Sequence, residues 1–401
     1  MSVGGLSNSR LERMHRILSG HVERQHVPGL VFLVARGEDV HAEAIGTMAF
    51  GQPAPMRRDS IFRVASIVKP VTAAAAMMLV EDCRLRLDDS IEPWLPELAE
   101  RRVLKSIASE LDDTVPAQRA ISVRDLLTSR MGFGSVMAMP DTYPIQRAIR
   151  ELRIGGDGPP KPALQPRTEQ WLRNLGSLPL MAQPGERWMY NVSSDVLGIL
   201  IERVSGQTFG AFLRERLFDP LGMKDTGFFV PEPHIQRLPP CYAFDYQAQA
   251  VTVFDGVADS AWNAPPPLES GAGGLVSTID DYFAFSRMLL NHGRHGREQL
   301  LSPATVSLMT SDQLDANHRI GAELFFGTHS SWGLGMAVGI GRNEIFQSPG
   351  RFGWDGGFGT SAYTDPGNDL IGLLYTQRLM DSPEPPKLYT DFWTCAYAAI
   401  E

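Results

Sequence analysis

The sequence feature that most constrains the fold is an uncharged apolar run, Pro70 to Val80, within a longer helical segment from Ala65 to Cys83. Alanine, methionine, leucine and valine lie on every side of the helix that this segment predicts, so the helix has no polar face to turn toward water. A membrane span needs about 20 apolar residues, and the run is shorter than that. We therefore expect this helix inside the core of a large folded protein.

The charge balance restricts the partners that the chain can have. The net charge is −9 and the pI is about 5.5, whereas binding to nucleic acid needs a basic stripe or patch. The segment Met1 to Arg10 has no apolar stretch of the kind found in secretory signals. We therefore expect a cytoplasmic protein with no nucleic-acid or membrane partner. Three separated cysteines are expected to be buried and unpaired, and they are Cys83, Cys241 and Cys395.

Strand-like segments lie near both ends of the chain and helices lie between them. Strands are predicted at Gly29–Ala35, 40–50, 332–340 and 363–375, with turns at Arg36–Asp39 and Asp365–Asn368. Helices are predicted near residues 11–22, 123–128, 195–204, 209–217, 280–291, 303–311 and 387–400. The pattern indicates an α/β domain made from residues 1–80 and 326–401. A mostly helical domain, residues 81–325, is inserted between its two parts.

The segment Arg63-Val-Ala-Ser66-Ile-Val-Lys69-Pro70 is the strongest local signal for chemistry. Ser66 fits a helix N-cap, and Pro70 must lie in the first turn. A spacing of three residues places Lys69 on the same face as Ser66. The positive potential of a helix N-terminus would favour an alkoxide or an oxyanion there. Ser-x-x-Lys also occurs by chance in chains of this length, and a purely structural role stays open.

A serine nucleophile needs a neighbouring base, and lysine at its ordinary pKa is protonated at neutral pH. Lys69 would therefore need burial or a partner that moves the proton. Tyr190 is the candidate, because it lies in an irregular segment after the turn Pro184-Gly and just before a helix. The alternative is a half-buried tyrosine that only caps the helical domain.

With these segments in place, the chain resembles the serine β-lactamase and penicillin-binding protein superfamily, in particular its class C-like branch with the family VIII carboxylesterases. Further similar stretches are Ile121–Thr128, Gln183–Phe209, Leu217–Met223 and Gly273–Asp280, and Trp354–Thr360 falls where the third motif is found. The resemblance implies an α+β fold with an antiparallel sheet flanked by helices and an inserted helical domain. It also implies an active site in the cleft between the two.

The resemblance implies roles for particular residues. Ser66 would be the acylated nucleophile, Lys69 the base or its partner, and Tyr190 the group that deprotonates Ser66 or water. The oxyanion hole would be formed by the backbone N–H groups of Ser66 and Gly357. Glycine at Gly356 and Gly357 would let the strand approach an acyl group closely.

Two motifs depart from the lactamase pattern. The second motif ends in asparagine in class C enzymes, but Val192 stands here and Asn191 comes one place early. In the third motif, Trp354 replaces the usual lysine and Asp355 the threonine. An indole beside an acid, both assigned to substrate binding, favours apolar acyl or alcohol groups over an anionic ligand. Both departures therefore favour an ester over a lactam.

The other patterns predict no metal or cofactor. His292 and His295 lack a metal-binding spacing and are interpreted as part of a solvated loop. The segment Gly333–Gly339 lacks the spacing of a nucleotide-binding loop and is interpreted as a strand. Arg63 is expected to be structural. Trp188 and Trp354 are expected to line the pocket if the active site lies in a cleft, and to be core residues otherwise.

The sequence thus predicts a metal-free serine carboxylesterase that acts on small or medium acyl esters. Acyl transfer to an alcohol, β-lactamase or D-amino-acid peptidase activity, and a catalytically silent binding protein stay open as alternatives. The pattern does not fix the oligomeric state, and a homo-oligomer is one of the arrangements left open.

Overall fold

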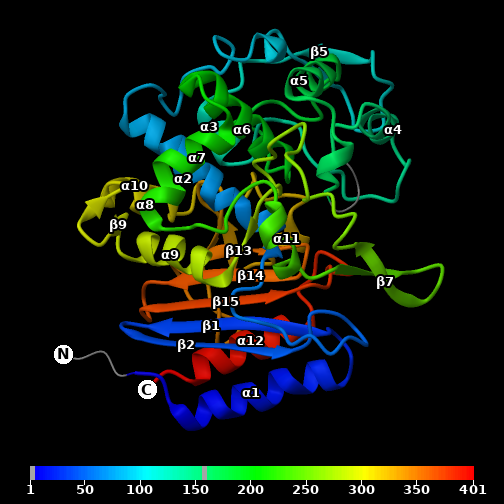
Figure 1. The fold of residues 1–401 in the computed structure, drawn as a ribbon. Coiled ribbons are helices and arrows are strands. Elements are labelled where there is room, and N and C mark those ends of the chain that lie inside the picture. Colours follow the sequence, from blue (N-terminus) through cyan, green and yellow to red (C-terminus); the bar gives the residue numbers. More distant parts are fainter. Residues whose placement is uncertain (1–4, 156–159) are drawn as a thin grey trace.

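The centre of the molecule is a seven-stranded antiparallel sheet with the order β11-β12-β13-β14-β15-β1-β2 (Figure 1). A computed structural model describes residues 5–155 and 160–401. The strands are β1 (Gly29–Arg36), β2 (Asp39–Gly46), β11 (Ser330–Trp332), β12 (Ala337–Gly339), β13 (Phe352–Gly356), β14 (Thr360–Asp365) and β15 (Leu370–Thr376). The antiparallel α+β fold expected from the resemblance is confirmed.

The two ends of the chain meet inside this sheet. Strand β1 pairs with β15 over its whole length, from Leu30 opposite Thr376 to Arg36 opposite Leu370. Both strands are apolar and almost completely buried, because layers of helices cover both faces of the sheet. The predicted strand 40–50 ends earlier, at Gly46, and the predicted strand 332–340 is two short strands, β11 and β12, joined by a turn. The turn at Asp365–Asn368 is confirmed.

Two helices from opposite ends of the chain cover one face of the sheet: α1 (Asn8–Glu23) and α12 (Lys387–Ala398) (Figure 1). Helix α1 has the predicted apolar stripe, with Leu11, Met14 and Leu18 buried. Phe392 of α12 packs edge-on against Phe32 of β1 at a ring-centroid distance of 6.2 Å. The N-terminal and C-terminal segments therefore form one layered unit.

The other face of the sheet carries α9 (Ile279–Leu290) and the rest of the helices (Figure 1). These are α2 (Val68–Glu81), α3 (Val123–Leu127), α4 (Pro144–Glu151), α5 (Thr168–Ser177), α6 (Val192–Ser205), α7 (Phe209–Leu213), α8 (Asp219–Leu221), α10 (Pro303–Met309) and α11 (Glu323–Phe326). Helix α2 is buried along nearly its whole length and packs against α6, as its apolar surface predicted. Helices α4, α5 and α11 were not predicted.

In the described parts of the chain, four short two-stranded sheets lie outside the main sheet. They are β3 (Phe62–Arg63) with β8 (Val276–Ser277), β4 (Arg102–Leu104) with β5 (Thr114–Pro116), β6 (Cys241–Asp245) with β7 (Ala250–Asp255), and β9 (Arg294–His295) with β10 (Glu298–Gln299). The pair β9–β10 replaces the loop predicted around His292 and His295. The proposed domain boundaries stay a prediction, although α9 lies against the sheet and not within the helical part.

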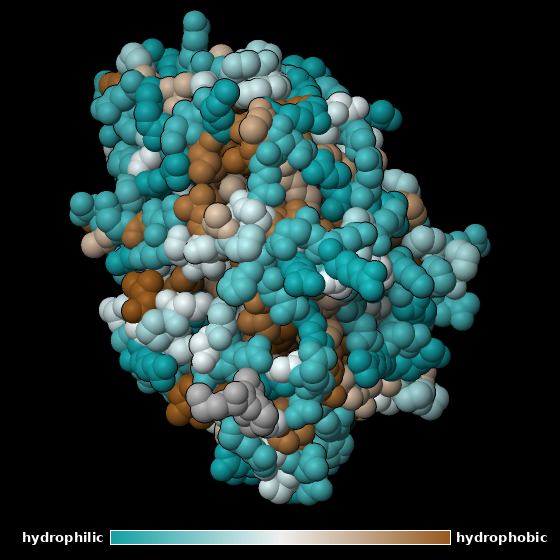
Figure 2. Space-filling model, turned by 90° about the vertical axis from the view of Figure 1, so that its left-hand side faces the viewer, coloured by the Kyte–Doolittle hydropathy of each residue, from teal (hydrophilic) through white to brown (hydrophobic). Residues whose placement is uncertain are grey.

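Hydrophilic residues cover most of the face shown in Figure 2, and hydrophobic residues gather in separate patches between them. Within the described residues, no single helix is both long enough and apolar enough to cross a membrane. The helices at 192–205 and 209–221 meet the length and hydropathy criteria only when they are counted together, and they are bent by 80° relative to each other. All three cysteines are unpaired as predicted, but Cys83 is exposed and not buried. It follows the end of α2 in a left-handed conformation (φ 58°), which turns it out of the core.

Candidate active site

Ser66 lies in a sharp bend between β3 and α2. A short 3-10 helix, η1 (Ala65–Ile67), makes this bend, and Ala65 adopts a left-handed conformation with φ 42°. Such a conformation is costly for a residue with a Cβ, and it is typical of functional sites. The prediction that Ser66 is an N-cap is wrong: the N-cap of α2 is Ile67, and in the described chain no side chain caps this helix. The half-buried Ser66 hydroxyl is therefore not used by the end of its own helix.

Lys69 is buried in the first turn of α2, with 1% of its surface exposed. Its Nζ donates a hydrogen bond of 2.7 Å to the carbonyl oxygen of Ala272 and lies 4.5 Å from the centroid of the Tyr190 ring. Burial lowers the pKa of Lys69 to about 7, although the charge of Asp195 acts in the opposite direction. A large fraction of this amine is therefore neutral at physiological pH and able to accept a proton.

Tyr190 provides the third group of the site, and its hydroxyl joins Ser66 to the sheet. The phenol oxygen accepts a 2.8 Å hydrogen bond from Nε1 of Trp354 on β13, and the Ser66 side chain lies close enough to the same hydroxyl to lower its pKa. Burial raises the pKa of Tyr190 to about 12, and the effects of Ser66 and Trp354 partly offset this rise. The phenol is therefore protonated at neutral pH, so Lys69 is the better candidate for the resting base.

The backbone on both sides of Tyr190 is held in place. Its carbonyl oxygen accepts a hydrogen bond from the N–H of Ser135, and the N–H of Met189 donates to the carbonyl oxygen of Ser129. Asn191, the N-cap of α6, has φ 85° and ψ −70°, a tight γ-turn conformation that is rare and strained. The chain thus turns sharply directly after Tyr190, as it does directly before Ser66.

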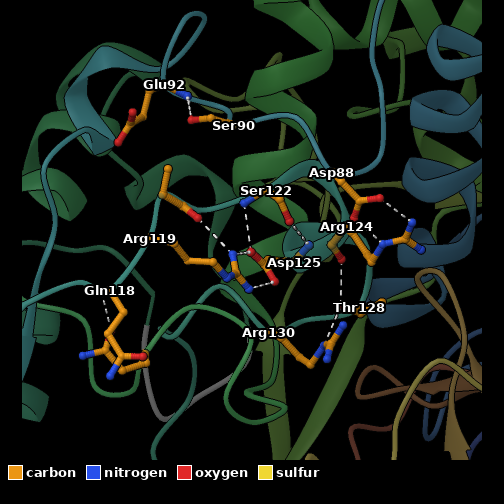
Figure 3. A network of polar contacts seen from close by, with 12 residues as sticks. Asp88, Ser90, Glu92, Gln118, Arg119, Ser122, Arg124, Asp125, Thr128 and Arg130 are labelled. Atoms are coloured by element: carbon orange, nitrogen blue, oxygen red, sulfur yellow. Dashed lines mark hydrogen bonds and ion pairs between the residues drawn. The ribbon is translucent and has the colours of Figure 1, made fainter.

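A polar network around α3 anchors the segment that holds Tyr190 (Figure 3). Ser122 and Asp125 form a capping box at the start of α3, and the guanidinium of Arg119 binds both carboxylate oxygens of Asp125. Past the end of this helix, Arg130 donates to the hydroxyl of Thr128 and to the ring of His318. The network therefore fixes the backbone of residues 128–130, which in turn receives hydrogen bonds from Gly185 and Met189.

The turn between β13 and β14 packs against the backbone just before Ser66. A Cβ on Gly356 would lie 2.6 Å from the carbonyl oxygen of Val64, so only glycine fits at this contact. Gly357 follows at the exposed tip of the turn, and nothing lies within 4 Å of the place that its Cβ would occupy. In the described residues, the N–H groups of Ser66 and Gly357 donate to no acceptor. Both predicted oxyanion-hole donors are therefore available to a ligand.

Asp355 faces away from this site. Its neighbour Trp354 points to Tyr190, and successive residues of a strand point to opposite faces. The Asp355 carboxylate accepts hydrogen bonds from the hydroxyls of Ser361 at 2.5 Å and Tyr363 at 3.2 Å. Burial raises the pKa of Asp355, and these hydrogen bonds lower it. The hydrogen bonds of Asp355 to Ser361 and Tyr363 are structural contacts within the sheet, and we assign Asp355 no contact with substrate.

The two positions that depart from the lactamase pattern of the second motif also differ in their surroundings. Val192 is buried in the hydrophobic core with 5% of its surface exposed, so it does not face the cleft. Asn191 lies in the γ-turn at the start of α6. Val192 therefore provides no polar group for the amide of a lactam.

A cavity of about 710 Å³ opens beside Tyr190 and leads into the helical part of the molecule. Apolar side chains form much of its wall, including Val103, Leu104, Ile107, Val136, Met137, Met181, Trp188, Met189, Ile320 and Phe325. Charged residues lie among them, and they are Lys105, Glu186 and Arg187. Trp188 lines this cavity as expected and stacks against Tyr190 at a ring-centroid distance of 5.5 Å.

Three contributors to the site were missed by the sequence reasoning. Phe325 on α11 packs against the ring of Tyr190 at a centroid distance of 5.0 Å. The carbonyl of Ala272 binds Lys69, and Asp195 lies buried on α6 close enough to act on its charge. No motif marks these residues, because their positions depend on contacts between distant parts of the chain.

The described residues include no group of three or more histidine, cysteine, aspartate or glutamate side chains arranged to hold a metal ion. Arg63 is structural as expected. It is buried and binds the carboxylate of Asp255, the carbonyl oxygen of Pro239 and the hydroxyl of Ser260.

This fold, with a serine, a lysine and a tyrosine gathered between the sheet and the helical part, defines the class of β-lactamase-like and penicillin-binding proteins. The Beta-lactamase family model matches residues 14–390, and the chain belongs to this family. The resemblance noted in the sequence is thereby confirmed.

Several relatives extend over nearly the whole chain. An uncharacterized protein of Mycobacterium tuberculosis is 36% identical over 361 residues, which are 88% of this chain and 86% of the relative. Esterase EstB of Burkholderia gladioli is 28% identical and covers 93% of this chain and 92% of its own. The solved structure of EstCE1, described as a hydrolase with promiscuous acyltransferase activity, has a TM-score of 0.78 at 24% identity and covers 97% and 98% of the two chains.

Proposed function

We propose that this protein is a serine carboxylesterase that cleaves small to medium acyl esters through an acyl-enzyme on Ser66. The observation that carries the proposal is the place of Tyr190: its hydroxyl interacts with the Ser66 side chain, and its ring centroid lies 4.5 Å from the buried amine of Lys69. Full-length relatives named esterases support the ester as substrate. One is EstB, and another is the lovastatin esterase of Penicillium rubens, which is 31% identical over 371 residues, 86% of this chain and 87% of the relative.

In the proposed acylation, the Ser66 oxygen attacks the ester carbonyl. The Ser66 proton moves to the Tyr190 oxygen as the phenol proton moves to the neutral amine of Lys69. The C–O bond of the ester then breaks, and the alcohol leaves with the proton returned through Tyr190. Water repeats the sequence on the acyl-enzyme and releases the acid.

The negative oxygen of each tetrahedral intermediate would be bound by the N–H groups of Ser66 and Gly357. These donors are supplied by backbone that is held rigidly, because Gly356 packs against Val64. Loss of one such donor typically slows turnover on the order of 10²–10³-fold.

The character of the cavity supports an uncharged ester. Its wall is largely apolar, and Trp354 stands where related enzymes carry the lysine that attracts a carboxylate. Methionine side chains at Met137, Met181 and Met189 adapt to different shapes. We therefore propose that an apolar acyl or alcohol group of medium size occupies the cavity.

The central test replaces Ser66 by alanine and follows hydrolysis of p-nitrophenyl acetate and butyrate. Ser66→Ala should reduce kcat/KM on the order of 10⁴-fold or more with an unchanged unfolding temperature. A Ser193→Ala variant is the matched control, since this buried serine on α6 lies outside the proposed machinery and its Oγ has no hydrogen-bond partner in the described chain. Full activity of the Ser66 variant would refute the nucleophile.

Acyl transfer is the second candidate, because the apolar wall of the cavity can hold an alcohol in place of water. Hydrolysis and transfer are separated by product analysis with p-nitrophenyl butyrate and a competing alcohol such as butanol. A butyl ester as the main product would favour transfer. Turnover of nitrocefin at a rate comparable to that of the esters would favour a lactamase. Failure of a fluorophosphonate to label Ser66 would favour a silent binding protein.

A further inference from the structure

A buried carboxylate lies behind the three groups of the proposed mechanism. Asp195 is in the first turns of α6, on the same helix that begins directly after Tyr190, and 7% of its surface is exposed. A buried carboxylate is costly unless it is paired and hydrogen-bonded. Its contacts therefore show what it does for the fold.

Asp195 binds the turn segment Ser270–Gly273, which holds Lys69. One carboxylate oxygen accepts hydrogen bonds from the hydroxyl of Ser270 at 2.5 Å and from the N–H of Ala272 at 3.2 Å. The carbonyl oxygen of the same residue, Ala272, accepts the hydrogen bond from Nζ of Lys69 at 2.7 Å. The peptide units around Ala272 therefore connect the carboxylate to the amine.

Packing leaves this connection little freedom. A Cβ on Gly271 would lie 2.3 Å from the carbonyl oxygen of Ser194, so this segment touches the backbone of α6 directly. The hydroxyl of Thr72 on α2 donates to the carbonyl oxygen of Gly271 at 2.8 Å. Helices α2 and α6 thus hold the segment between them, with Lys69 on one helix and Asp195 on the other.

The negative charge of Asp195 also raises the pKa of Lys69. Burial raises the pKa of Asp195, while the Ser270 hydroxyl and Lys69 lower it. The residues of segment Ser270–Gly273 and of η1 that surround the amine of Lys69 are uncharged. Tyr190 contacts the amine with its aromatic ring. Asp355 of β13 acts on Tyr190 and not on Lys69. Within the described residues, the electrostatic balance at Lys69 is therefore set by its burial and by Asp195.

We propose that Asp195 is a positioning residue of this site: it fixes the Ala272 carbonyl that holds Lys69, and its charge biases Lys69 toward the protonated form. The inference rests on the proposed function, since the amine must accept a proton from the Ser66–Tyr190 pair. A carboxylate that retains the proton on Lys69 tunes the base to work near neutral pH.

The test is the pH profile of an Asp195→Asn variant with p-nitrophenyl butyrate. Asparagine keeps the shape and an oxygen that can accept from Ser270 and Ala272, but it removes the charge. Without the charge the pKa of Lys69 falls further, so the acidic limb of kcat/KM should move to lower pH by about 0.5 unit or more. We also expect kcat to fall about threefold to tenfold, because a more weakly basic amine is a poorer base.

A Glu269→Gln variant is the matched control. Glu269 is a half-buried carboxylate whose pKa is raised by burial, and it accepts a hydrogen bond from the N–H of Gly210. It exerts no charge effect on Lys69. Its variant should keep the pH profile of the unchanged protein. The inference is overturned if Asp195→Asn is folded and its pH profile and kcat match those of this control.

If Asp195→Asn does not fold, Ser270→Ala tests the positioning alone. It removes one hydrogen bond to the carboxylate and keeps the charge, so kcat should fall about threefold or more with little change in KM. An unchanged kcat would overturn the positioning role. If the proposed function is wrong, Ser66→Ala stays active. If only this inference is wrong, Ser66→Ala is inactive and the Asp195 and Ser270 variants have normal activity.

Discussion

At the scale of single residues, the backbone conformation places the proposed nucleophile, Ser66. Ala65 accepts a left-handed φ so that Ser66 projects toward Tyr190 and does not cap its own helix. Asn191, immediately after Tyr190, also has a strained backbone conformation with positive φ. Strain of this kind persists only when the surrounding structure enforces it. Here the hydrogen bonds of Ser135 and Met189 to neighbouring backbone enforce it on the tyrosine side.

The pKa of Lys69 predicts the pH dependence of activity. Because the neutral amine is the proton acceptor, and its pKa is lowered to about 7, kcat/KM should fall below about pH 7, close to tenfold for each pH unit at lower pH. Burial raises the pKa of Tyr190 to about 12, so its ionisation should not change kcat/KM within the usual assay range. The measurement is kcat/KM for p-nitrophenyl butyrate between about pH 5.5 and 9.

Lys69→Arg is the companion variant, since a guanidinium stays protonated over this whole range and cannot accept the proton. It should be inactive at every pH. A kcat/KM of the unchanged protein that stays level down to about pH 5.5 would contradict the assignment of Lys69 as the base, because a carboxylate would still be ionised there.

The indole of Trp354 predicts a second effect at this scale. Trp354→Phe keeps an aromatic ring but removes the N–H that binds the Tyr190 oxygen. We expect kcat to fall about tenfold, the equivalent of one hydrogen bond, with a smaller change in KM. Trp171→Phe removes a comparable indole hydrogen bond, to the carbonyl oxygen of Ile154, and should lower stability without lowering kcat. Equal kcat values for the two variants would show that Trp354 does not orient Tyr190.

At the scale of elements, local patterns predicted most of the helices and the strands at both ends, because each has a clear period or a clear turn. Helix α2 was evident from its apolar surface, and β1 and β15 from their buried aliphatic residues. The pattern indicated that both ends of the chain form one domain, but periodicity alone could not show that β1 pairs with β15. The exposure of Cys83 depends on a local turn that no strong turn residue marks. The split of strand 332–340 falls at Gly333 and Gly335, which the pattern interpreted as glycines within a strand.

The candidate site shows the same limit. Ser66, Lys69 and Tyr190 were found because motifs mark them, and the structure brings them together. Ser66 was misassigned as an N-cap because the left-handed Ala65 has no signal in the sequence. Asp195 was missed for a different reason: its function depends on Ser270 and Ala272, about 75 residues away along the chain.

The turn between β13 and β14 gives a prediction at this scale. Gly356→Ala would place a methyl group 2.6 Å from the carbonyl oxygen of Val64 and 2.1 Å from Oγ1 of Thr360. The turn must move away from Ser66, so we expect a loss of stability of about 1–3 kcal/mol and a fall in kcat/KM of about tenfold or more. Thermal unfolding and ester hydrolysis measure the two effects.

Gly357→Ala is the structural control, because open space surrounds the added methyl group. Its unfolding temperature should match that of the unchanged protein. A Gly356 variant with normal stability would mean that this turn is not held by its contact with Val64.

At the scale of the whole molecule, the ends of the chain build the layer that supports the site. Helices α1 and α12 pack side by side, and the N–H of Ser7 donates to the carbonyl oxygen of Ala399 (Figure 1). Strands β13 to β15, which carry Trp354 and the Gly357 turn, rest on this layer. The stability of the layer is therefore a condition for the geometry of the site.

Phe392→Ala tests this support. The ring is fully buried between β1 and the neighbouring Trp393, so its removal should lower the free energy of unfolding by about 3–5 kcal/mol. Activity per folded molecule should stay the same below the unfolding transition, since no atom of the site is changed. Chemical denaturation measures the loss, and Tyr246→Ala, at a side chain that is 65% exposed, should have almost no effect. An equal stability for both variants would contradict the role of the layer.

The aromatic cluster at the cleft makes the intrinsic tryptophan fluorescence of the protein sensitive to ligand binding. Of seven tryptophans, three lie in ring contact around Tyr190: Trp188 and Trp354 touch it, and Trp332 touches both of them. A molecule that fills the cavity lies against Trp188, which lines it, and changes the polarity around this cluster. Intrinsic fluorescence excited near the indole absorption band should therefore follow occupancy of the cleft in real time, without a dye or a chromogenic ester.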